Sequence, residues 1–190
     1  MNACYRAWGK RILDVALALV GAGVAIPVAA VLCRLVTWTS PGPVILCQLR
    51  LGQHGRPFLM VKFRSMTLDG ARVTPFGWWL RATALDELPQ VINILQGSMS
   101  FVGPRPLLEG DVDLLRMIPE AQRRASIIPG LAGLAQLYGG KHPTPADRLA
   151  LDLWYTRHVG FWLDGWIVCR AMLTSLGARW EPPMVPCHRA

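Results

Sequence analysis

The chain has 190 residues, of which 52% are hydrophobic and 17% charged, with 20 Lys and Arg against 12 Asp and Glu. Such a chain can bury a large apolar core, which excludes an intrinsically disordered protein, and its length suits one domain. Five cysteines without a CxxC pattern exclude a disulfide-stapled miniprotein and argue against a structural zinc site.

The net charge of +8 lies in the N-terminal part of the chain. Residues 1–81 hold ten basic and two acidic residues, whereas residues 82–190 hold ten of each sign. A basic segment indicates contact with nucleic acid, anionic lipid or a phosphate-bearing substrate. Because no RNA- or DNA-binding motif accompanies the charge, we expect no nucleic-acid partner.

A long apolar segment begins at Val15 and ends at Cys33, nineteen residues without a charge. A helix of this length nearly crosses the ~30 Å hydrocarbon core of a bilayer. Burial in a globular core is the alternative, although a chain of 190 residues seldom hides such a stretch. We therefore expect this helix to insert into membrane lipid.

Basic residues flank the apolar segment on both sides: Arg6, Lys10 and Arg11 before it, and Arg34, Arg50 and Arg56 after it. Positive flanks favour the cytoplasmic face. A re-entrant helix that enters, bends at Pro27 and returns to the same face therefore satisfies both ends. A straight spanning helix is the alternative, and it would place one basic group outside.

The middle of the chain predicts a β-hairpin followed by a helix. Two β-prone runs, 44–48 and 58–63, surround a polar loop with two glycines. Further on, apolar residues at 88, 91, 92 and 95 follow the spacing of one helix face. Asp86 is the predicted N-cap of that helix, and Gly97 marks its C-terminal end.

The last part of the chain predicts mostly helix. Helices are expected at 111–124, 147–158 and 162–176, with a glycine-rich loop at 129–140. Together the elements predict an α+β fold class: a helix-rich, membrane-associated single domain with an N-terminal re-entrant or spanning helix, a short β-hairpin and interfacial amphipathic helices. Residues 1–36 are the expected inserted helix and basic flank, 37–180 the cytoplasmic domain, and 181–190 a flexible tail.

The adjacent acids Asp86 and Glu87 carry the clearest chemistry. Taken alone, an acidic pair at a helix start is most simply explained by capping and a favourable dipole interaction. Four basic residues accompany the pair along the chain: Lys62, Arg64, Arg81 and Arg105. Carboxylates bind hard cations through oxygen and guanidiniums bind phosphate oxygens, so this set predicts a site for a metal-bound diphosphate.

Four motifs resemble those of the bacterial sugar transferase family, in that family's order. They are Lys-Phe-Arg-Ser-Met (62–66), Leu-Asp-Glu-Leu-Pro-Gln (85–90), Ser-Met-Ser-Phe-Val-Gly-Pro-Arg-Pro (98–106) and Ile-Pro-Gly-Leu-Ala-Gly (128–133). Two further matches, at 10–14 and 151–155, extend the resemblance from about Lys10 to about Leu176. The ordered combination is highly specific, whereas each motif alone is weak.

The resemblance implies a small monotopic polyprenyl-phosphate phosphoglycosyl transferase. Such enzymes transfer a phosphosugar from a UDP-sugar donor to a polyprenyl phosphate, typically undecaprenyl phosphate, in the first membrane step of surface glycan biosynthesis. The implied location is the bacterial inner membrane, with the catalytic domain on its cytoplasmic face. One departure lies in the membrane helix, where Ile26-Pro27 replaces the Ser-Pro pair common in small members.

The resemblance also assigns roles to individual residues. Asp86 is the implied nucleophile, forming an aspartyl-phosphosugar intermediate and lying against Mg2+, with Glu87 as its partner. The implied substrate phosphate-binding residues are Lys62, Arg64, Arg81, Arg105 and Asp152. Asp152 matches a further functionally important acid of the family.

An inactive, membrane-anchored basic scaffold protein is the alternative from a different class. The anchor and the basic segment would serve it, but it would not need Asp86, Glu87 and Arg105 together. The sequence names neither the sugar nor the glycan pathway, and it leaves a homodimer open.

Overall fold

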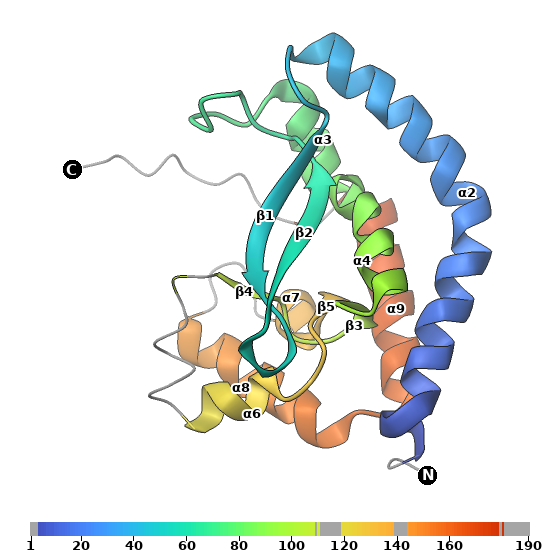
Figure 1. Cartoon of the computed structure of the whole chain (residues 1–190), viewed down its shortest axis with the longest axis vertical. Helices are drawn as coiled ribbons and strands as arrows, with labels where there is room; N and C mark the ends of the chain where they lie inside the picture. The colour runs from blue at the N-terminus through green and yellow to red at the C-terminus, as the bar shows by residue number, and fades with distance from the viewer. Residues whose placement is uncertain (1–3, 109, 111–118, 139–143, 179, 181–190) are drawn as a thin grey trace.

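The computed structural model describes residues 4–108, 110, 119–138, 144–178 and 180 (Figure 1). Its elements in chain order are η1 (Tyr5–Gly9), α2 (Lys10–Thr39), β1 (Ile45–Leu51), η2 (Gln53–Gly55), β2 (Pro57–Phe63), α3 (Pro75–Ala82), η3 (Leu85–Gln90), α4 (Val91–Gln96), β3 (Ser100–Val102), β4 (Leu107–Leu108), α6 (Pro119–Ala125), β5 (Gly130–Ala132), α7 (Leu134–Tyr138), α8 (Pro145–His158) and α9 (Phe161–Leu176). This mixture confirms the helix-rich α+β prediction. The expected tail 181–190 and most of the expected helix 111–124 lie outside the described residues.

The apolar segment forms α2, a helix of 30 residues that is about 45 Å long at 1.5 Å per residue. It is long and apolar enough to cross a membrane. Pro27 lies within the helix without interrupting it, so the sharp bend predicted at this proline is replaced by a gradual curve along one side of the molecule (Figure 1).

The N-terminal end of α2 is attached to the rest of the chain by buried polar contacts. Asp14 accepts hydrogen bonds from the Ser100 hydroxyl and the Phe101 amide, each at 3.0 Å. Lys10 forms an ion pair with Asp164 of α9 at 2.6 Å. Because these polar groups are removed from water, each needs its partner to be stable in this position.

The C-terminal end of α2 is attached by apolar packing. Leu32 and Val36 form a buried cluster with Phe63 of β2 and Leu80 of α3. Between the two ends, three large side chains on the outer face are mostly exposed: Val20 at 81%, Val24 at 70% and Ile26 at 68%. Both ends of α2 therefore dock on one body, and its middle presents an apolar surface.

The predicted hairpin is confirmed. β1 and β2 pair antiparallel, with Ile45 opposite Phe63 and Leu51 opposite Pro57, and β4 adds to the other edge of β1. Asn93 of α4 bonds the second edge of β2: its Oδ1 accepts from the Val61 amide at 3.1 Å, and its Nδ2 donates to the Leu59 carbonyl at 2.7 Å. The side chain thus completes backbone pairing that a further strand would otherwise supply.

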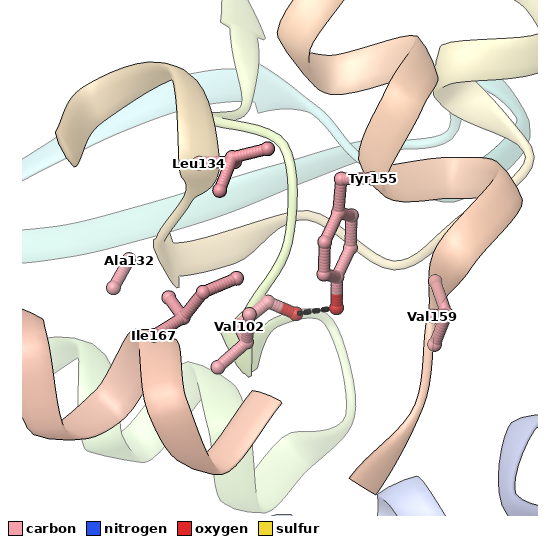
Figure 2. Packing of buried hydrophobic residues seen from close by; sticks show 6 residues of the cluster. All are labelled: Val102, Ala132, Leu134, Tyr155, Val159 and Ile167. Carbon is pink, nitrogen blue, oxygen red and sulfur yellow. Dashed lines mark hydrogen bonds between the residues drawn. The ribbon is translucent and has the colours of Figure 1, made fainter. Parts of the chain in front are cut away.

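A second core forms around the parallel pair β3–β5, which packs against α7, α8 and α9 (Figure 2). Figure 2 shows the Tyr155 hydroxyl pointing at the Val102 carbonyl, to which it donates at 3.3 Å. The glycine-rich loop predicted for this region is wrong, because residues 130–132 form a strand and 134–138 a helix. A Cβ on Gly130 would lie 2.0 Å from the Gly103 amide nitrogen, so glycine here permits the close pairing.

Only part of the predicted apolar stripe 88, 91, 92 and 95 faces the core, where Leu88 packs against the cluster of Leu32, Val36, Phe63 and Leu80. Ile92 and Leu95 are 53% and 40% exposed, whereas Asn93 and Ile94 are buried. Six residues before α4 are wound as the 3₁₀ helix η3, which turns about 120° per residue instead of 100°. This winding changes the face on which the side chains of α4 lie relative to those of η3. The helices predicted at 147–158 and 162–176 are confirmed as α8 and α9.

Candidate active site

The acids Asp86 and Glu87 lie in η3, directly after a strained residue. Ala84 has a φ of +56°, in the left-handed region that costs a non-glycine residue about 1–2 kcal/mol. The Glu87 amide donates to the Ala84 carbonyl at 3.1 Å and closes this turn. Asp86 is therefore inside the 3₁₀ helix, where it is 7% exposed, and the prediction that it caps a helix is wrong.

Lys62 of β2 interacts electrostatically with both acids and with two arginines, Arg81 of α3 and Arg105 of the segment between β3 and β4. Burial lowers the pKa of Lys62, and the Asp86 carboxylate gives the largest opposing effect. The Arg81 and Arg105 guanidiniums lower the same pKa further, while Glu87 raises it. We call Lys62, Arg81, Asp86, Glu87 and Arg105 the charged cluster.

Arg105 lies at the exposed side of the charged cluster. Its Nη2 donates to Glu87 Oε1 at 2.9 Å, and its side chain is 42% exposed against 15% for Glu87. The neighbouring Pro104 and Pro106 are buried, and a proline ring restricts the backbone on both sides of Arg105. The guanidinium is therefore held beside Glu87 with part of its surface exposed. A guanidinium can donate charge-assisted hydrogen bonds to phosphate oxygens.

Arg81 is held in place by Ser65, which follows the end of β2. Its Nε donates to the Ser65 hydroxyl oxygen at 2.9 Å. Helix α3 can lie this close because Gly77 has no side chain: a Cβ there would be 1.9 Å from the Ser65 carbonyl oxygen. Thr74 caps the start of α3 by accepting from the Gly77 amide at 2.9 Å.

Arg64 has other partners than the phosphates predicted for it. It is buried, its Nη1 donates to the Pro41 carbonyl and its Nη2 to the Ser40 carbonyl, each at 2.7 Å. Ser40 is the C-cap of α2, and carbonyls at a helix end lack partners within the helix. The structure thus assigns Arg64 to holding the chain where it leaves α2.

Asp152 contacts an arginine that the sequence did not single out. Its Oδ2 accepts from Arg124 Nε at 2.6 Å. Burial raises the pKa of Asp152, and the Arg124 guanidinium opposes that rise. Arg124 also donates from Nη2 to the Arg105 carbonyl at 2.6 Å. Asp152 is thereby linked to Arg105 through Arg124, and the only sequence signal for Arg124 is its place shortly before the Ile-Pro-Gly motif.

The carboxylates fit an open magnesium site better than a closed one. Among the described residues, no group of three or more His, Cys, Asp or Glu side chains is placed to hold a metal ion. Mg2+ commonly uses one or two carboxylates and completes its shell with water and substrate phosphates. Asp86 and Glu87 can supply those carboxylates, and the basic side chains of the charged cluster can balance the negative charge of substrate phosphates.

Comparison with known proteins identifies the class to which this site belongs. The family described as bacterial sugar transferase matches residues 5–178. This match covers nearly the whole chain, including all of the charged cluster. The chain belongs to the bacterial sugar transferase family.

Individual relatives share roughly two residues in five. The chain is 40% identical over 149 residues to the uncharacterized sugar transferase EpsL of Bacillus subtilis (strain 168), covering 71% of this chain and 72% of that protein. It is 39% identical to the UDP-glucose:undecaprenyl-phosphate glucose-1-phosphate transferase of Xanthomonas campestris pv. campestris, over 76% of this chain and 34% of that protein. It is 36% identical to the UDP-N-acetylgalactosamine-undecaprenyl-phosphate N-acetylgalactosaminephosphotransferase of Aeromonas hydrophila, over 90% of this chain and 45% of that protein. The chain thus spans less than half the length of these last two relatives.

Proposed function

We propose that this chain is a phosphoglycosyl transferase that moves a sugar phosphate from a UDP-sugar to undecaprenyl phosphate. The observation that carries the proposal is the charged cluster, in which Lys62 interacts electrostatically with the buried carboxylate Asp86, with Glu87, and with Arg81 and Arg105 from separate elements. The names of the Xanthomonas and Aeromonas relatives support the donor and acceptor classes. The names of those two relatives give different sugars, glucose and N-acetylgalactosamine, so a panel of UDP-sugars is the test that identifies the donor of this chain.

In the first step a carboxylate oxygen of Asp86 attacks the sugar-bearing phosphorus of the donor. The bond from this phosphorus to the bridging oxygen breaks, and UMP leaves with the electron pair. In the second step a phosphate oxygen of undecaprenyl phosphate attacks the same phosphorus and releases the Asp86 carboxylate. Phosphoryl transfer depends mainly on position and charge neutralisation, which Lys62, Arg81 and Arg105 supply around the acid.

Mg2+ is the proposed cofactor, held by Asp86 with support from Glu87. When bound, the ion would spread the negative charge of the donor diphosphate. Glu87 is already held by Arg105 at 2.9 Å, so this carboxylate is positioned by the protein's own contacts.

We further propose that the middle of α2 enters the cytoplasmic leaflet of the inner membrane and that both its ends remain on the cytoplasmic side. The docking of both ends on one body supports this arrangement, as does the exposed apolar face between them. Trp8 and Trp38, near the two ends, are 73% and 87% exposed, and tryptophan is enriched at the membrane–water boundary. Residues 37–180 would then hold the catalytic site at the depth of the acceptor's phosphate.

Asp86→Asn tests the nucleophile. We expect turnover to fall by roughly a thousandfold or more, because the amide cannot form the acyl phosphate, while the near-identical shape preserves folding and membrane association. UMP release from a panel of UDP-sugars with undecaprenyl phosphate and Mg2+ measures the loss, and mass spectrometry of enzyme given donor alone detects the phosphosugar on Asp86. Asp69→Asn, an exposed acid in a turn, is the matched control.

Two results would contradict the proposal. Substantial turnover by Asp86→Asn would remove Asp86 from the role of nucleophile. Failure of the unchanged protein to release UMP from any common UDP-sugar would instead favour the inactive scaffold.

A further inference from the structure

A line of charged contacts runs from α8 to the charged cluster. Asp152 accepts from Arg124 Nε at 2.6 Å, Arg124 Nη2 donates to the Arg105 carbonyl at 2.6 Å, and Arg105 Nη2 donates to Glu87 at 2.9 Å. The first two contacts are largely removed from water, because the side chains of Arg124 and Asp152 are only 12% and 5% exposed. One guanidinium thus binds a carboxylate on one side and a main-chain carbonyl on the other.

The main chain leading to Arg105 is bonded at successive residues. The Val102 carbonyl accepts from the Tyr155 hydroxyl at 3.3 Å, the Gly103 amide donates to the Ala132 carbonyl at 2.9 Å, and the Pro104 carbonyl accepts from the Gly130 amide at 2.9 Å. The next carbonyl is that of Arg105 itself, and Arg124 is its partner. Loss of Arg124 would therefore remove a main-chain hydrogen bond at the residue whose side chain meets Glu87.

Asp152 is needed for Arg124 to do this. A guanidinium that is mostly removed from water requires a charged partner, and a carboxylate on Nε fixes the plane of the group. Asp152 lies on α8 and Arg124 on α6, so the pair joins two helices that contribute no residue to the charged cluster.

We propose that Arg124 and Asp152 are positioning residues that hold the Arg105 main chain and so set where its guanidinium meets Glu87 and the donor diphosphate. The catalytic consequence rests on the proposed function, whereas the effect on the Arg105 main chain does not. The two parts can therefore be tested separately.

A double-mutant cycle on kcat/KM tests the catalytic part. Arg124→Gln should lower kcat/KM by roughly 10- to 100-fold in the unchanged protein, and by less than about threefold when Arg105 is already alanine, because the two residues act through one contact. Arg123→Gln removes the same charge from the adjacent, exposed position of α6. It should leave kcat/KM unchanged both in the unchanged protein and in the Arg105→Ala background. An equal loss from Arg124→Gln in both backgrounds, or no loss in either, would overturn the proposal.

Hydrogen exchange of the full chain tests the structural part without any turnover. We expect the amides of Arg105, Leu107 and Leu108 to exchange roughly tenfold faster in Arg124→Gln than in Arg123→Gln. Arg124→Gln alone removes the ion-pair partner of the buried Asp152, which could impair folding. The second variant therefore combines Arg124→Gln with Asp152→Asn and removes both charges. It should fold and show the same faster exchange. Unchanged exchange in both variants would overturn the proposal, and absence of UMP release by the unchanged protein would overturn only the proposed function.

Discussion

Lys62 shows how the surroundings of one residue determine what it can do. It lies near the end of β2, where burial disfavours its charged form and the carboxylate of Asp86 favours it. The balance leaves its pKa below the ordinary value of 10.5. A lysine in this position is a phosphate ligand only while it is protonated, so the charged cluster is sensitive to alkaline pH.

This sensitivity leads to a prediction for the pH profile. As pH rises, Lys62 loses its proton at a lower pH than an ordinary lysine, and kcat/KM, which reports groups of the free enzyme, should fall on a limb below pH 10.5. Lys62→Arg, which stays protonated, should move that limb to higher pH. Thermal unfolding at each pH controls for alkaline denaturation, and a limb unmoved in Lys62→Arg would show that another group titrates there.

At the scale of elements, η3 and α4 form one unit that delivers both the acids and the support of the hairpin. The 3₁₀ winding of η3 places Asp86 in the interior, and the following α4 presents Asn93 to the edge of β2. Lys62 lies on that same strand, next to Val61, which donates to Asn93 at 3.1 Å. The position of the acids relative to Lys62 therefore depends on the Asn93 contacts.

Asn93→Leu tests this connection through stability. The variant keeps a similar shape but leaves the Val61 amide and the Leu59 carbonyl without their side-chain partner. At about 1–3 kcal/mol for each of the two groups, this should lower the free energy of unfolding by about 2–6 kcal/mol. Gln96→Ala, on the exposed side of the same helix, should leave it nearly unchanged. Equal melting temperatures for the two variants in detergent would refute the role of Asn93.

At the scale of the whole molecule, α2 is attached through two different kinds of contact. Its N-terminal end relies on a buried polar group in which Asp164 accepts from Lys10 at 2.6 Å, and from Tyr5 and Tyr155 at 2.7 Å each. Its C-terminal end relies on apolar packing against β2 and α3. Since the Tyr155 hydroxyl oxygen also lies 3.3 Å from the Val102 carbonyl, the same group of side chains joins α2 to the strand that leads to Arg105.

The attachment of both ends predicts the membrane topology. Two variants are needed, each with a single cysteine: one keeps Cys4 and the other carries Thr39→Cys, with the remaining cysteines changed to alanine. An impermeant thiol reagent should label both variants in inside-out vesicles and neither in intact spheroplasts. Both positions are exposed, and labelling of lysed membranes serves as the control. Labelling of the two positions from opposite sides would establish a spanning helix.

Local patterns determined much of this protein by themselves. The length of the uncharged segment predicted α2, two β-prone runs around a polar loop predicted the β1–β2 hairpin, and apolar spacing predicted α8 and α9. Each of these signals acts over a few neighbouring residues. The acidic pair and its basic companions stood out in the same way, and their ordered motifs resembled the family to which the chain belongs.

Only the tertiary structure decided which of these residues meet. Arg64 and Asp152 were grouped with the phosphate ligands by sequence, yet their partners are the carbonyls after α2 and the guanidinium of Arg124. The roles of Arg124 and Asn93 could not be predicted from neighbouring residues, since their contacts with Arg105, Asp152, Val61 and Leu59 join positions 19 to 34 residues apart along the chain. Such contacts depend on how whole elements pack, and the 3₁₀ winding of η3 changes which side chains of the adjoining α4 face the core, so no pattern of neighbouring residues determines them.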